Sequence, residues 1–322
     1  IVQAYGWAEG MKIATMIGAN VKTWPTSSSA VPKSVSAGDF AAGLAIDFYA
    51  WAEVDKVGAA KIDYIVPEGL SVINPDSIAI LKGAPNLELA KEFVEFVMSK
   101  TGQKLLMLKK GAPEGPVNLL IGRMCVMPSL YAELGNQSVV PVNPFIVKSS
   151  LKYNETLGTI RYVLLNDMIG AMIIDAQREL SAAWGEIIGV TQTLAKANVT
   201  SAKLTEAMNV LGSVPLTEAQ ILALAANWTD PALRNTYITQ WRTFALKKYD
   251  NATKLAKAAA ADVQQKIAEL QTYYQGIITR LEGEKTNNLY MGLGGGVVLG
   301  LLVGVVIAYF MTRRREIAAV KA

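Results

Sequence analysis

The sequence contains no histidine and only one cysteine, Cys125, among its 322 residues. Without histidine the chain has no Ser-His-Asp or Cys-His catalytic arrangement, and it lacks the imidazole ligands of most protein metal sites. A single cysteine forms no intrachain disulfide, so an extracellular domain would have to be stable without one. We therefore expect no enzymatic activity, no metal and no cofactor, and we expect Cys125 to be a buried thiol.

The chain also has little net charge and no N-terminal export signal. The formal charge is only +4 and is spread along the chain, which gives no reason to expect nucleic-acid binding. The chain begins at Ile1, without an initiator methionine or a signal peptide. Because the features below predict export, we expect that an N-terminal part has been lost.

The longest stretch without any charge includes the apolar residues 289–311. At about 1.5 Å of helical rise per residue it reaches roughly 35 Å, enough to cross a hydrocarbon core about 30 Å thick. Arg313, Arg314 and Arg315 follow at once, and this asymmetry predicts a cytoplasmic tail at residues 312–322. The sequence therefore predicts a single-pass protein of the cell membrane, with residues 1–288 outside the cell.

Glycines recur every four residues inside this segment, at Gly292, Gly296, Gly300 and Gly304. A small-residue face of this kind allows close helix approach. We expect it to pack either on a second copy of the chain or on a permease helix.

Five Asn-x-Ser/Thr sequons lie before the charge-free segment and none lies after it. Such a placement is required for glycosylation of an external domain. We therefore predict glycosylation at Asn136, Asn154, Asn198, Asn227 and Asn251.

The first 125 residues predict an alternation of helices and strands. Apolar residues recur at helical spacing over residues 5–20, with Gly18 as a stop signal, and an amphipathic helix begins at Asn86. Short apolar runs at residues 41–48, 62–66 and 78–81 predict buried strands. The first of these places candidate ligand contacts at its C-terminal end, where ligands sit in open α/β sheets: Asp47, Tyr49 and Trp51. Ser27 and Ser28 are further candidates, although such a run is also typical of a solvated loop.

Two stretches carry a resemblance to a known family: GDFAAGLAIDFYAW and YIVPEGLSVINPDSIAILKGAPNLELAKEFVEFVMSKTGQKLL. They resemble the second half of an ABC-transporter extracellular solute-binding protein, in the group whose ligands include ferric iron, thiamine and other small solutes. The resemblance implies a lobe of the α/β periplasmic-binding-protein type II class at residues 1–125, with the first lobe missing. It also implies a small-molecule solute and an ABC permease as partners.

In the ferric-binding members of this family two adjacent tyrosines follow the strand that matches AGLAID. Here these positions hold Phe48 and Tyr49. Phe48 has no phenolate, so the resemblance implies an uncharged or cationic organic solute instead of iron. Tyr49 is either a ligand contact or an aromatic residue packed beside Trp51.

Residues 126–243 predict a helical region, as in archaeal family members that carry a membrane anchor. From residue 244 to 288 apolar positions alternate in steps of three and four: Leu246, Tyr249, Thr253, Ala256, Ala260, Val263, Ile267, Leu270, Tyr274, Ile277 and Leu281. This spacing predicts either a coiled-coil stalk, which would allow a homo-oligomer, or one amphipathic helix packed on the chain's own domain.

The combined expectation is a membrane-anchored receptor that hands a solute to a permease. The alternative is a structural cell-surface protein, such as an envelope-layer anchor or stalk, that keeps a transporter-like domain as a scaffold.

Overall fold

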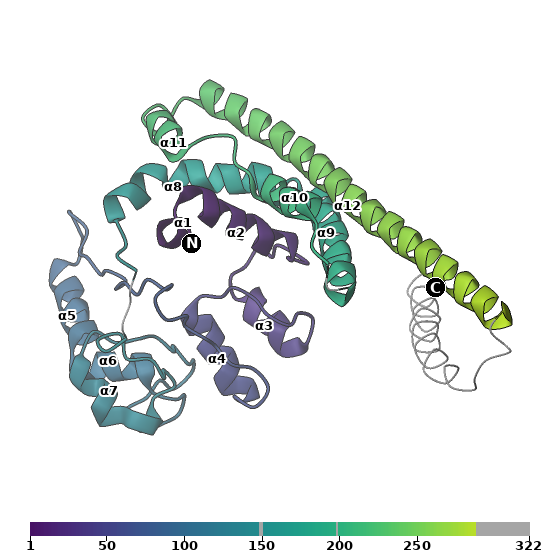
Figure 1. The fold of residues 1–322 in the computed structure, drawn as a ribbon. Coiled ribbons are helices and arrows are strands. Elements are labelled where there is room, and N and C mark those ends of the chain that lie inside the picture. Colours follow the sequence, from purple (N-terminus) through teal and green to yellow (C-terminus); the bar gives the residue numbers. More distant parts are fainter. Residues whose placement is uncertain (148–150, 198, 288–322) are drawn as a thin grey trace. The chain divides into compact units, whose positions relative to one another are not determined.

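The structure is a computed structural model, and it describes residues 1–147, 151–197 and 199–287. The predicted membrane segment, the tail and Asn198 lie outside the described residues. The chain divides into two compact units, residues 1–259 and 260–322. The α-helices of the described part are α1 (Val2–Tyr5), α2 (Trp7–Ala19), α3 (Ala30–Ala37), α4 (Asp47–Val57), α5 (Leu87–Met98), α6 (Lys100–Met107), α7 (Pro128–Leu134), α8 (Glu155–Ile169), α9 (Gln177–Ala197), α10 (Ala202–Gly212), α11 (Glu218–Ala225) and α12 (Pro231–Asn287), labelled in Figure 1. A short 3-10 helix, Gly135–Gln137, follows α7.

The predicted α/β lobe is wrong. The only β-type pairing among the described residues is one isolated antiparallel bridge, Leu108 to Ser138. The expected strand at residues 41–48 is a loop that runs into α4 at Asp47, and residues 62–66 and 78–81 lie outside any regular element. A strand needs a neighbour for its backbone groups, and here Ile65 and Leu81 are 75% and 80% exposed. A short apolar run does not by itself identify a strand.

The helical predictions for the same region agree better with the structure. α2 covers most of residues 5–20, and Asn86 stands at the N-cap of α5, although its side chain makes no cap hydrogen bond. Gly18 does more than end α2. A Cβ at Gly18 would lie 2.3 Å from Ile173 Cγ2, so glycine here permits close packing of α2 on the segment that follows α8.

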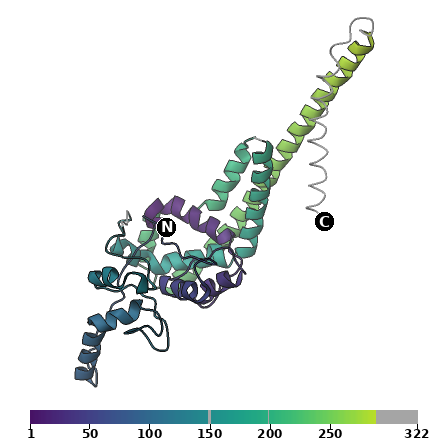
Figure 2. The same ribbon diagram turned by 90° about the horizontal axis from the view of Figure 1, so that it is seen from below.

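That segment is a π-helical turn, Gly170–Ile174, which links α8 to α9. The α2, α9 and α10 helices pack on one another, and Figure 1 and Figure 2 both show them side by side. Tyr249 of α12 closes the turn by donating its hydroxyl hydrogen to the Met172 carbonyl at 2.7 Å. The core of this region includes Leu164, Met168, Leu180, Ile187 and Leu211, together with the aromatic residues Trp228, Trp241 and Tyr249.

Inside the first unit, α12 presents a buried stripe of four alanines and one tyrosine: Ala245, Tyr249, Ala252, Ala256 and Ala259. Asp230 precedes this helix, and its side chain accepts the Ala232 N–H at 2.8 Å. The apolar spacing of residues 246–259 therefore belongs to packing within the chain's own domain. In the second unit, Leu270, Tyr273 and Tyr274 are exposed on α12, and a coiled coil of this part stays a prediction.

One helical stretch among the described residues, Glu155–Ile174, has the length and composition to cross a membrane. Two of its charged residues are paired with other helices: Arg161 with Glu218, and Asp167 with Arg234. Core helices of packed domains share this composition, and the stretch is weak support for a membrane location.

Candidate functional site

The first turn of α4 gathers a carboxylate and two aromatic rings. Asp47 opens the helix and lies in the first turn, where a negative charge interacts favourably with the helix dipole. Asp47, Phe48 and Tyr49 are all half-buried. The Phe48 and Tyr49 ring centroids are 4.3 Å apart. The Asp47 carboxylate and the two aromatic rings therefore lie together on one turn.

Arg123 reaches this turn from the loop between α6 and α7. Its backbone N–H donates to the Leu106 carbonyl at 2.8 Å. The preceding Gly122 has a left-handed backbone (φ 67°) and lies close to the Phe48 carbonyl. These contacts place the Arg123 guanidinium 3.8 Å from the Phe48 ring centroid, an attractive cation–π geometry. Arg123 also forms an ion pair with Asp76.

Tyr64 stands behind this turn. Its hydroxyl donates to the Ala45 carbonyl at 3.4 Å, and its ring meets Trp51 edge to face at 5.6 Å. Burial raises the pKa of Tyr64, and the negative charge of Asp47 adds to the effect. Tyr64 therefore stays neutral at physiological pH, close enough to feel the charge of Asp47.

The structure places the other predicted site residues differently. Trp51 is only 3% exposed, so its ring packs inside the fold, and its indole N–H has no hydrogen-bond partner in the described part of the chain. Ser27 and Ser28 are exposed in the turn before α3, where the Ser27 hydroxyl bonds to Ser29. No hydrogen bond among the described residues joins these serines to α4.

Sequence reasoning missed Arg123 and Asp76. Asp76 lies 47 residues before Arg123, and neither residue belongs to a periodic pattern. The only available signal was Gly122, a glycine before an isolated charge. Such a signal marks a turn but does not identify what the next side chain contacts.

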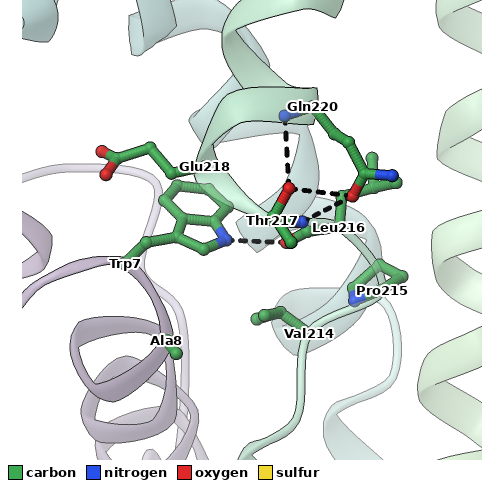
Figure 3. Close-up of a pocket in the computed structure, with 8 residues that line it drawn as sticks. All are labelled: Trp7, Ala8, Val214, Pro215, Leu216, Thr217, Glu218 and Gln220. Atoms are coloured by element: carbon green, nitrogen blue, oxygen red, sulfur yellow. Dashed lines mark hydrogen bonds between the residues drawn. The ribbon is translucent and has the colours of Figure 1, made fainter.

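Two cavities lie away from the α4 turn. One, of about 370 Å³, is lined by Trp7, Ala8 and residues 214–218 and 220, and Figure 3 shows the Trp7 indole N–H donating to the Leu216 carbonyl at 2.8 Å. The Thr217 and Gln220 side chains there bond each other in the cap of α11. We read this cavity as a gap beside a helix cap, because much of its polar lining is already engaged.

The second cavity, of about 560 Å³, lies beside α7 and includes Asn136, Ser138 and Tyr131. The Tyr131 hydroxyl donates to the Cys125 carbonyl at 2.9 Å and accepts the Cys125 N–H at 2.8 Å. Cys125 is 2% exposed, so the prediction of a buried thiol is confirmed.

Four predicted glycosylation sites belong to the described residues, and all four asparagines are exposed: Asn136, Asn154, Asn227 and Asn251. The Asn154 side chain also caps α8 by accepting the Leu157 N–H at 2.9 Å. Their glycosylation stays a prediction.

A search of the described residues finds no group of three or more His, Cys, Asp or Glu side chains placed to hold a metal ion.

Comparison with known proteins gives one match. Residues 2–119 match the family model of bacterial extracellular solute-binding proteins, a segment that includes α4 with Asp47, Phe48 and Tyr49. No curated protein and no solved structure matches the chain. The match supports a solute-binding role in transport for this part of the chain.

Proposed function

We propose that this chain is a membrane-anchored extracellular solute-binding protein that delivers a small organic solute to an ABC permease. The observation that carries the proposal is the family match over residues 2–119, a segment that contains the first turn of α4. In this proposal Asp47 accepts hydrogen bonds from the solute and Tyr49 donates one. Trp51 packs against Tyr64, whose hydroxyl bonds to the Ala45 carbonyl just before this turn.

The anchoring part of the proposal rests on the charge-free residues 289–311 and on Arg313, Arg314 and Arg315, which follow them. Protease added to intact cells should remove the chain before residue 289 and leave the tail protected. An epitope placed after Lys321 and digested in intact cells would reverse the proposed orientation.

A thermal-shift screen of the purified full chain tests solute binding. A solute at 100 times its dissociation constant adds about 2.7 kcal/mol of stability, so a true ligand gives an upshift of several degrees. Asp47→Ala and Tyr49→Ala should remove the upshift and leave the melting point without solute nearly unchanged. A tyrosinate-to-iron absorption band in the purified protein would contradict the organic-solute proposal.

A structural surface role is the second candidate, and the length of α12, 57 residues, favours it. In that case residues 260–281 associate with a second copy, and no solute in a broad screen shifts the melting point. Replacing Ile267 and Leu270 with Asp should then abolish association, because the seam would have to bury two charges.

A further inference from the structure

The Asn136 side chain lies at the wall of the second cavity, which has a volume of about 560 Å³. The lining of this cavity is mixed. Amide and hydroxyl groups come from Asn136, Ser138 and Asn143, and apolar surface comes from Pro141 and Ile146. Asn136 is exposed, and its side chain makes no hydrogen bond to another residue that the structure describes. A cavity of this size and composition is typical of a small-molecule site, and Asn136 places a free amide within it.

The backbone around Asn136 is held in place on both sides. The α7 helix ends at Gly135, whose left-handed backbone (φ 46°) is one that glycine adopts at little cost. The short 3-10 helix that follows carries Asn136 to the surface. The chain is then fixed again, because the Val139 N–H donates to the Met107 carbonyl at 2.8 Å. The free amide and the cavity wall therefore belong to one short, fixed segment.

The apolar part of the wall is uncovered in the part of the chain that the structure describes. Ile146 is 75% exposed although it lines the cavity. Tyr131, which also lines it, meets the Phe145 ring edge to face at 6.0 Å. The Asn143 amide oxygen accepts the Phe145 N–H at 3.0 Å, which leaves the NH₂ group of Asn143 to donate. A sugar ring matches this lining, because its C–H faces cover apolar surface and its hydroxyls accept hydrogen bonds from an amide.

Asn136 also begins an Asn-x-Ser sequon, which ends at Ser138. The other described sequons have different surroundings. The Asn154 side chain is engaged as the cap of α8, and Asn251 lies inside α12. Asn227 is exposed in a turn, but it lines neither of the two cavities. Among these four sequons, Asn136 alone combines a free side chain with a cavity beside it.

We propose that Asn136 carries an N-linked sugar whose first ring lies in this cavity, against Ile146 and within hydrogen-bonding reach of Asn143. Met107 lines the same cavity and belongs to the small buried cluster of this region, so the sugar adds cover to that cluster. The proposal goes beyond solute binding. It shares with the proposed function only the location of this part of the chain outside the cell.

The attachment is a group transfer from a lipid-linked sugar phosphate. The Asn136 amide nitrogen forms a bond to C1 of the sugar and gives up one proton. The bond between C1 and the phosphate oxygen breaks, and the lipid phosphate leaves with its electron pair. The product keeps one N–H on Asn136 and places the sugar at the cavity wall.

The first test uses the full chain from a host that attaches its native sugars. Mass spectrometry of its peptides should find sugar on Asn136. Asn136→Gln keeps an amide but removes the sequon, and it should lower the melting temperature by about 2–4 °C. Ser138→Thr keeps the sequon and the hydroxyl, and should preserve both the sugar and the melting temperature. Asn227→Gln is the matched control and should leave the melting temperature unchanged, whether or not Asn227 carries sugar.

The same substitution in a host without N-glycosylation separates the sugar from the side chain. There Asn136→Gln should be neutral, because the Asn136 side chain has no hydrogen bond to lose within the described part of the chain. Ile146→Ser should also be nearly neutral in that host, since Ile146 is so exposed. In the glycosylated chain, Ile146→Ser should remove most of the stabilisation that the sugar gives. Such non-additivity is expected of two groups in contact.

Each result decides the proposal. A native chain without sugar on Asn136 overturns it. A sugar on Asn136 that can be removed with no change in melting temperature, or that leaves the effect of Ile146→Ser the same in both hosts, extends into solvent instead and also overturns it. These results leave the solute-binding function standing. A screen in which no solute binds contradicts that function and leaves the sugar site untouched.

Discussion

Two regions of the first unit use similar apolar residues in opposite ways. Residues 151–259 bury many of their large apolar side chains, including Leu180, Ile187 and Trp241, and leave a smaller number exposed: Tyr153, Ile160, Tyr162, Val163, Ile174, Val199 and Leu246. Residues 41–146 leave many exposed: Leu44, Ile46, Ile65, Leu70, Val72, Ile78, Ile80, Leu81, Leu87, Leu89, Phe93, Phe96, Met98, Val117, Leu119, Val126, Phe145 and Ile146. The buried apolar residues of this second region are fewer: a small cluster of Met107, Leu108, Cys125, Leu130 and Leu134, together with Ala50, Trp51 and Val140.

The difference shows where the stability of this unit comes from. Burial of apolar surface supplies most of the driving force for folding, so the helical region should hold most of it. The α4 site belongs to the sparsely packed region. Binding sites are often drawn from the less stable parts of a protein, which is consistent with a site that tightens when a solute binds.

The largest effect is expected for a substitution of Asp167, which lies in the packed region. Its carboxylate accepts from the Trp228 indole N–H at 2.8 Å and from Arg234 Nε at 2.7 Å. Burial raises the pKa of Asp167, but these hydrogen bonds outweigh burial and hold the pKa below its usual value. Asp167→Ala should cost about 3 kcal/mol because it leaves the buried indole N–H unpaired.

Urea denaturation at pH 7 measures this cost. Asp250→Ala is the control, since its ion pair with Lys254 is exposed on both sides and should contribute less than about 0.5 kcal/mol. Equal costs for the two variants would mean that Asp167 is solvated in solution. Its hydrogen bonds to Trp228 and Arg234 would then contribute little to the stability of the packed region.

The next effect concerns Lys248, which is 4% exposed and donates to the Ser213 carbonyl at 2.8 Å. Burial lowers the pKa of Lys248 to about 7. The unfolded chain therefore binds more protons between pH 7 and about 10.5, and stability rises with pH across that window. Below pH 7 the protein carries the full cost of a buried ammonium.

Lys248→Met should therefore stabilise the protein at pH 6, by about 2 kcal/mol, because the Ser213 hydrogen bond offsets part of the burial cost. The gain should shrink towards pH 10. Lys247→Met, at an exposed neighbour, should change stability little at either pH. A gain that does not depend on pH would exclude titration of Lys248 as its cause.

The sequence predicted local structure better than tertiary partners. Helix periodicity located α2, and Asn86 located the start of α5, because these signals lie within a few residues of each other. The predictions of strands at residues 62–66 and 78–81 were wrong because an apolar run does not reveal whether a neighbouring strand exists. Arg123 was missed for the same reason, since its contact with Phe48 spans 75 residues.

The seam on α12 gave a mixed result. Its three–four spacing correctly indicated an apolar stripe, but the pattern alone left open what the stripe packs on. Ala252 and Ala259, which the predicted seam omits, are fully or largely buried. Small side chains at these positions are typical of close packing within a domain, and the spacing of Leu and Ile alone did not reveal it.

A third prediction uses two alanines of this helix. Ala256 is fully buried in the first unit, and Ala268 is exposed in the second. Ala256→Leu overfills a packed interface and should cost about 1–2 kcal/mol, while Ala268→Leu should be near neutral in thermal denaturation. Equal tolerance of both substitutions would show that the α12 stripe is loosely packed in solution.

The smallest effect is expected for Ile65, in a comparison of an exposed isoleucine with a buried one. Ile65 is 75% exposed in the sparsely packed region, and Ile187 is fully buried in α9. Ile65→Thr therefore removes little apolar surface from contact and should change the free energy of unfolding by less than about 0.5 kcal/mol. Ile187→Thr, the same chemical change, removes buried methyl contacts and places a hydroxyl in an apolar core, at a cost of about 2–3 kcal/mol. Urea denaturation of the two variants at matched pH measures the difference. If Ile65→Thr costs as much as Ile187→Thr, residue 65 is covered in solution, and the contrast between the two regions does not hold.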